Sequence, residues 1–124
     1  KGFGWEGKLL AAYASILTKT KSNLRIVALE DVLALNIPVE LLEKLYTRHS
    51  CWQIVGRKVA ESIVIERELR EAQLLIENAT SRYQKFVNEF SDIVDRLPQF
   101  EIASYLGITP VALSKIRKNL SSLN

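Results

Sequence analysis

A short basic segment near the C-terminus carries side chains that could bind an acidic partner. Residues 109–120 read TPVALSKIRKNL and contain three bases but no acid. At helical spacing, the exposed side and its flanks would present six residues: Thr109, Val111, Ser114, Lys115, Arg117 and Lys118. Lysine and arginine bind phosphate, while hydroxyl and small apolar side chains reach the edges of bases. These residues therefore predict a DNA-binding surface.

Two short helices joined by a tight turn would hold this surface in place. Apolar residues at helical spacing predict a first helix over residues 99–106, and Gly107 supplies the turn after it. Thr109 and Pro110 are residue types that open a second helix. The inward side of the pair would carry Ile108, Leu113, Ile116 and Leu120. This is the helix-turn-helix arrangement, whose second helix lies in the major groove of DNA. The alternative is a helical hairpin with a solvated basic face.

The rest of the chain predicts further helices and one pair of strands. Residues 7–17, 39–48 and 80–96 carry apolar side chains at helical spacing. Between the first two segments, LRIVAL and VLALNI are rich in leucine and β-branched residues and are separated by Glu30 and Asp31. Runs of this composition favour adjacent strands of a hairpin.

The longest helical pattern runs from Trp52 to about Asn78 and is apolar on more than one side. Val55, Val59 and Ile63 form one stripe along it. A helix with two apolar sides must bury both, and a second copy of the same helix would cover one of them. The pattern thus predicts a homodimer formed through these three residues. A central helix in a monomeric bundle would explain the same pattern.

Composition argues against several classes of site. The 124 residues include one cysteine and one histidine, Cys51 and His49, so neither an intramolecular disulfide nor a zinc site is expected. Paired carboxylates, a phosphate loop and a nucleophile with a base are not recognisable, which predicts a protein that is not an enzyme and needs no cofactor. The sequence lacks the run of about 18 apolar residues that a membrane span needs, and its N-terminus lacks a signal pattern, so we expect a soluble protein. For a protein with a single cysteine, we expect a cytoplasmic location. The net charge of +3 favours an acidic partner.

The predicted helix-turn-helix and two segments before it resemble a known family. The stretch IASYLGITPVALSKIRKNL is similar to the C-terminal DNA-binding motif of the cyclic-AMP receptor protein and fumarate-nitrate regulator (Crp/Fnr) family of bacterial transcription factors, in its Bacteroidetes-like branch. SNLRIVALED and the later LLEKLY resemble the last strands and the following helix of that family's cyclic-nucleotide-binding β-roll.

The resemblance implies an α+β fold in three parts. Residues 1–50 would form part of the β-roll, residues 51–78 the dimerisation helix, and residues 79–124 a helix-turn-helix, winged-helix-like domain. The implied partners are a palindromic double-stranded DNA operator, a second copy of the chain, and RNA polymerase. The chain starts Lys-Gly-Phe-Gly-Trp and contains no methionine, so we expect it to begin within a longer protein or to have lost its initiator.

The chain departs from the family at the positions that bind the cyclic nucleotide. Gly7 and Lys8 stand where family members have Gly-Glu, and residues 21–23, Lys-Ser-Asn, stand where an arginine binds the phosphate. If an effector binds at all, Lys8, Lys21 and Arg25 are the candidates to hold it, and we expect no tight binding of cyclic AMP. A glutamate that some members use is replaced by Val111.

These observations predict a homodimeric, sequence-specific DNA-binding transcriptional regulator with a truncated or degenerate effector-sensing domain. The alternative is a cyclic-nucleotide-binding-like sensing or oligomerisation module with weak or no specific DNA binding.

Overall fold

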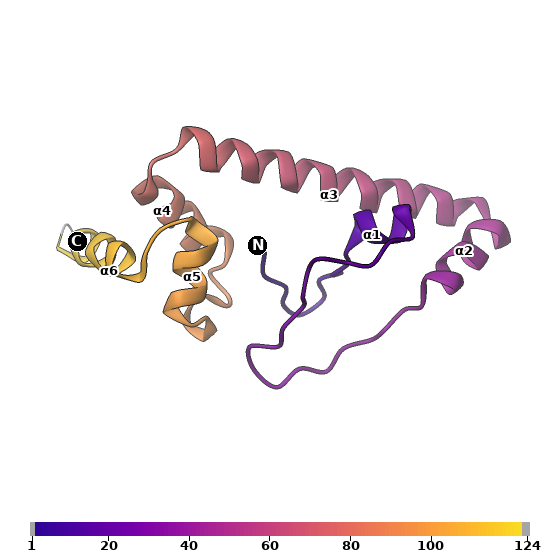
Figure 1. Cartoon of the computed structure of the whole chain (residues 1–124), viewed down its shortest axis with the longest axis horizontal. Coiled ribbons are helices and arrows are strands. Elements are labelled where there is room, and N and C mark those ends of the chain that lie inside the picture. The colour runs from indigo at the N-terminus through magenta and orange to yellow at the C-terminus, as the bar shows by residue number, and fades with distance from the viewer. Residues whose placement is uncertain (1, 123–124) are drawn as a thin grey trace. The chain divides into compact units, whose positions relative to one another are not determined.

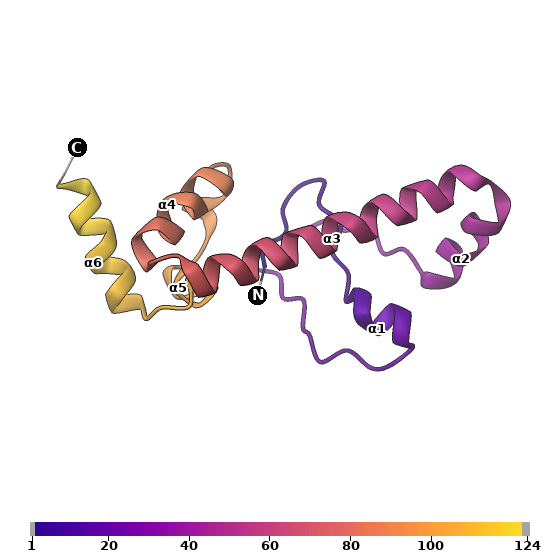
Figure 2. The same cartoon turned by 90° about the horizontal axis from the view of Figure 1, so that it is seen from above.

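The computed structural model describes residues 2–122. All regular secondary structure assigned within these residues is helical (Figure 1, Figure 2). In chain order the elements are α1 (Tyr13–Thr18), α2 (Val39–Arg48), α3 (Ser50–Ile76), α4 (Ala79–Glu89), the 3₁₀ helix η1 (Val94–Arg96), α5 (Gln99–Leu106) and α6 (Pro110–Ser121). The chain divides into two compact units. The C-terminal unit combines Lys1–Gly7 with Glu66–Asn124, and the middle unit is Lys8–Ile65.

The predicted α+β fold is wrong, because residues 2–122 contain no strand and no sheet. The two runs that were expected to pair, residues 24–29 and 32–37, have neither helical nor strand structure, and their side chains are exposed. Leu33 is 101% and Leu35 is 94% exposed. An isolated two-stranded hairpin is at best marginally stable in water. The two residues between the runs, Glu30 and Asp31, are also neither glycine nor asparagine, which tight hairpin turns favour.

The expected β-roll of residues 1–50 is therefore not present among the described residues. In its place, the middle unit has two helices before α3. The helix predicted over 7–17 is shorter and begins only at Tyr13, whereas the helix predicted over 39–48 is confirmed as α2. Tyr46 of α2 lies so close to Gly56 of α3 that a Cβ atom there would overlap the tyrosine ring. The glycine thus allows these two helices to approach each other.

The long helix α3 is confirmed, with 27 residues and a length of about 40 Å at 1.5 Å per residue. It ends just before Asn78, whose side chain accepts a hydrogen bond from the Ser81 amide at 2.9 Å and caps α4. The helix predicted over 80–96 is interrupted: α4 ends at Glu89, and η1 follows after a short turn.

The core of the C-terminal unit lies among α4, α5 and α6, which contact one another. Its buried residues are Phe86, Phe90, Ile93, Ile102, Ala103, Tyr105, Leu106 and Leu113. Phe3 and Trp5, from the other end of the sequence, pack against this cluster. The predicted inward residues of α6 and its approach agree with this arrangement, since Leu113 is buried and Ile108, Ile116 and Leu120 are half-buried.

The turn between α5 and α6 has the predicted chemistry. Gly107 adopts φ 68°, in the left-handed region that glycine tolerates best. The amide of Ile108 donates to the carbonyl of Ala103 at 3.0 Å, and that of Gly107 donates to the carbonyl of Ser104 at 3.2 Å. This pair of hydrogen bonds is the Schellman arrangement that ends many helices. Ala103 of α5 is completely buried, in the same cluster as Leu113 of α6.

None of the helices within residues 2–122 combines the length and the apolar character that a membrane span requires.

Leu113 tests whether the core holds α6 in place. Replacing this fully buried side chain with alanine leaves a cavity, and we expect the free energy of unfolding to fall by about 2–5 kcal/mol. Val111→Ala on the same helix is the matched control, because Val111 is 66% exposed. Urea unfolding followed by circular dichroism measures both variants. Equal losses for the two would contradict this packing.

Candidate nucleic-acid interface

The predicted DNA-binding surface lies on the side of α6 that faces away from the core. All six predicted residues are exposed: Thr109, Val111, Ser114, Lys115, Arg117 and Lys118. Leu113 between them is fully buried, so that the helix presents one apolar side to α4 and α5 and one polar side to solvent. The amphipathic pattern of α6 thus separates the residues that hold the helix from those that are available to a partner.

The N-terminus of α6 is fixed by Thr109. Its side-chain oxygen accepts a hydrogen bond from the amide of Ala112 at 3.2 Å, and Pro110 occupies the first turn, as predicted. The predicted role of Thr109 as the N-cap is confirmed. The hydroxyl keeps its proton and a second lone pair, so the Thr109 side chain can still donate a hydrogen bond to a ligand or accept one from it.

Positive charge dominates the exposed side of α6. Lys115, Arg117 and Lys118 are exposed, and the helix contains no aspartate or glutamate. The amide groups at the N-terminus of a helix add a partial positive charge at that end. A phosphate approaching α6 therefore meets favourable charge both at the start of the helix and along its second half.

Two arginines from other helices fix the C-terminal end of α5. The Arg70 guanidinium of α3 lies 3.9 Å from the centre of the Tyr105 ring and donates to the Tyr105 carbonyl. Arg82 of α4 donates through Nε to the carbonyl of Leu106 at 3.1 Å and through Nη1 to that of Glu77. The last carbonyls of a helix lack partners within the helix. Both arginines therefore stabilise the point from which the turn to α6 departs.

Sequence reasoning did not find Arg70 and Arg82. Their partners are backbone carbonyls 35 and 24 residues further along the chain. Any carbonyl can accept such a hydrogen bond, so the sequence around Tyr105 and Leu106 gives no sign of it.

The predicted dimerisation residues lie on the part of α3 that belongs to the middle unit. Val55 is 47% exposed, whereas Val59 and Ile63 are half-buried. The remaining apolar side chains Ile54, Val64 and Ile65 are 52%, 53% and 56% exposed. The helix is therefore apolar on more than one side, as its sequence indicates. That a second copy covers it stays a prediction.

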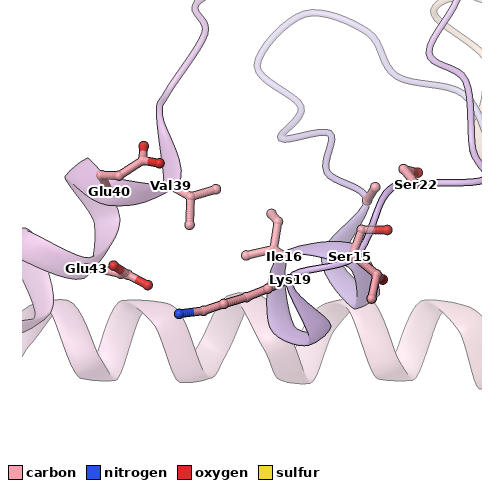
Figure 3. Close-up of a pocket in the computed structure, with 9 residues that line it drawn as sticks. Ser15, Ile16, Lys19, Ser22, Val39, Glu40 and Glu43 are labelled. Carbon is pink, nitrogen blue, oxygen red and sulfur yellow. The ribbon is translucent and has the colours of Figure 1, made fainter.

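The predicted effector-binding residues Lys8, Lys21 and Arg25 are exposed and lie outside the helices. An open hollow in the middle unit is lined by α1, α2 and the segment after α1 (Figure 3). None of the three residues lines it. Glu40 and Glu43 do line it, and Lys19 extends toward Glu43 (Figure 3). Two carboxylates make this hollow a poor site for a phosphate group.

A metal centre is equally unsupported within residues 2–122, where no three histidine, cysteine, aspartate or glutamate side chains gather. The candidate interface is the exposed side of α6.

Comparisons with protein-family models, with curated proteins and with solved structures return no match for this chain. The resemblance to the Crp/Fnr family stays a prediction from the residues quoted for it.

Arg82 tests how α5 and its turn are held. Arg82→Met keeps most of the aliphatic stem but removes the hydrogen bonds to Leu106 and Glu77. We expect the free energy of unfolding to fall by about 1–2 kcal/mol, since the lost bonds are charge-assisted but only partly buried. Arg117→Met, at an exposed position of α6, is the control. If urea unfolding shows no larger loss for Arg82→Met than for this control, the arginine does not support the turn.

Proposed function

We propose that the chain is a homodimeric, sequence-specific DNA-binding transcriptional regulator in which α6 is the recognition helix. One observation carries the proposal: the turn at Gly107 holds α6 across α5 so that its acid-free basic side faces solvent. A short helix joined to a preceding helix by such a turn is the arrangement that many regulators insert into the major groove.

Residues near the start of α6 would enter the groove most deeply. Val111 would contact a thymine methyl group, and Ser114 with Lys115 would hydrogen-bond to the edges of bases. Arg117 and Lys118 lie about a turn later, where the helix leaves the groove, and would bind backbone phosphates. This division assigns sequence preference to the first half of α6 and general affinity to the second.

A dimer would place two copies of α6 on successive turns of the DNA. Related by twofold symmetry, they would bind a palindromic operator with half-sites about 34 Å apart. The exposed apolar side chains of α3 support this part of the proposal, because a second copy would remove them from water. RNA polymerase as a further partner is implied by the family resemblance alone.

Lysine substitutions separate the two roles within α6. On an operator selected from random DNA, Lys115→Ala should weaken binding by about 1–3 kcal/mol and relax base preference at one or two positions per half-site. Lys118→Ala should weaken binding to all sequences alike and lower the slope of log affinity against log salt by about one unit. Gel-shift titration over a range of salt concentrations measures both effects.

Lys44→Ala is the matched control, because Lys44 is an exposed lysine on α2 and its loss changes the net charge equally. It should leave base preference unchanged. If neither α6 substitution alters affinity or salt slope relative to Lys44→Ala, α6 does not bind DNA. The chain would then be an oligomerisation module with weak or no specific DNA binding.

A charge on α3 tests the dimer. Ile63→Asp would place an unpaired carboxylate in the proposed subunit contact, and we expect dimers to dissociate into monomers. Sedimentation velocity at tens of micromolar measures the change, and circular dichroism verifies that the chain stays helical. Ser62→Asp, at an exposed neighbouring position, should remain dimeric. A wild-type chain that sediments as a monomer would exclude the proposed dimer.

A further inference from the structure

The buried aromatic cluster of the C-terminal unit is completed by residues from the opposite end of the sequence. Phe86, Phe90 and Tyr105 lie with ring centres 4.7–5.4 Å apart. The ring of Phe3 contacts all three, with centre distances of 6.0, 5.8 and 5.3 Å. Trp5 adds an edge contact to Phe90 at 5.4 Å. Such geometries are favourable for aromatic pairs beyond the area that they bury.

An ion pair between Glu6 and Arg96 adds a polar contact next to these aromatic contacts. Both guanidinium Nη atoms of Arg96 donate to the Glu6 carboxylate, at 2.9 and 3.3 Å. The two parallel hydrogen bonds give the pair a defined orientation. We name residues 2–7 the N-terminal arm. Along the arm, Phe3 and Trp5 contact the aromatic rings of the cluster, and Glu6 then pairs with Arg96.

The arm lies on the surface of the C-terminal unit. Phe3 and Trp5 are only half-buried, whereas Phe86 is 1% and Phe90 is 4% exposed. The arm carries no helix or strand, and Gly7 leaves it with φ 78°. Between the arm and Glu66, the chain passes through the whole middle unit, Lys8–Ile65. The arm is therefore a segment without helix or strand whose aromatic residues pack against the helical core.

We propose that Phe86, Phe90, Tyr105 and Arg96 form a docking site for a short extended peptide with two aromatic residues and an acid. Its occupant in this chain is the chain's own N-terminal arm. Phe3 and Trp5 of the arm pack on the aromatic surface, while Glu6 at its end pairs with Arg96.

Quenching of Trp5 fluorescence tests whether the arm is docked. Trp52→Phe leaves Trp5 as the only tryptophan in the chain. We expect acrylamide to quench Trp5 several-fold less than it quenches the free peptide Gly-Phe-Gly-Trp-Glu-Gly. Equal quenching in the chain and in the peptide would overturn the proposal.

Two further substitutions in this background test the specific contacts. Phe3→Ala and Arg96→Glu should each raise the quenching of Trp5 toward that of the peptide. The matched controls are Phe100→Ala, at a phenylalanine of α5 that is 61% exposed, and Arg117→Glu on α6. They should leave the quenching unchanged, with circular dichroism verifying helicity in every variant. Equal effects of contact and control variants would overturn the proposal.

Adding the arm as a separate peptide tests whether the site is a docking site. The full-length variant Phe3→Ala, Trp5→Ala, Trp52→Phe contains no tryptophan, so fluorescence from the added peptide reports its binding alone. We expect a saturable blue shift, which should vanish when Arg96→Glu is added. Absence of saturable binding to a variant that remains helical would overturn the proposal.

Dilution distinguishes the source of the arm. If the arm belongs to the same chain, the protection of Trp5 from acrylamide is independent of protein concentration. Protection that falls on dilution would mean that a second copy supplies the arm, and would overturn the assignment to the chain's own arm.

Discussion

The left-handed backbone at Gly107 is the constraint on which the arrangement of α5 and α6 depends. It lets the chain change direction within a few residues, and the two hydrogen bonds to Ala103 and Ser104 close the turn. With the turn fixed, α6 can bury Leu113 in a cluster that also contains the small side chain of Ala103 from α5. The basic side of α6 faces solvent because the opposite side is used for this packing.

Packing must supply the stability of these helices, because α5 has 8 residues and α6 has 12. Isolated helices of this length are marginal in water. The polar groups at the end of α5 are satisfied from outside, by Arg70 and Arg82. A hydrophobic core thus holds the helices together, while charge-assisted hydrogen bonds set where α5 ends. Neither contribution uses the bases of α6, which leaves Lys115, Arg117 and Lys118 available to a partner.

Features encoded within a few residues could be predicted, and features that need distant partners could not. Gly107, Thr109 and Pro110 define the turn by local backbone chemistry, and the structure has each in the expected role. The two runs at 24–37 have strand propensity, but that propensity reflects packing against neighbouring strands more than an intrinsic backbone preference. Within residues 2–122 they have no such neighbours. The contacts of Phe3 with the aromatic cluster likewise span most of the chain.

Exposed Val111 bears on whether the proposed DNA binding is sequence-specific. Val111 is 66% exposed, so folding leaves most of its apolar surface in contact with water. Its side chain is uncharged and cannot contribute to phosphate binding. In a major groove it could bury that apolar surface against a thymine methyl group, an interaction that other bases do not offer. Arg117 and Lys118 would attract any DNA, because every sequence carries the same phosphates. Under the proposed function, Val111 thus adds an apolar contact to the base contacts of Ser114 and Lys115, and general affinity depends on the charged residues in the second half of α6.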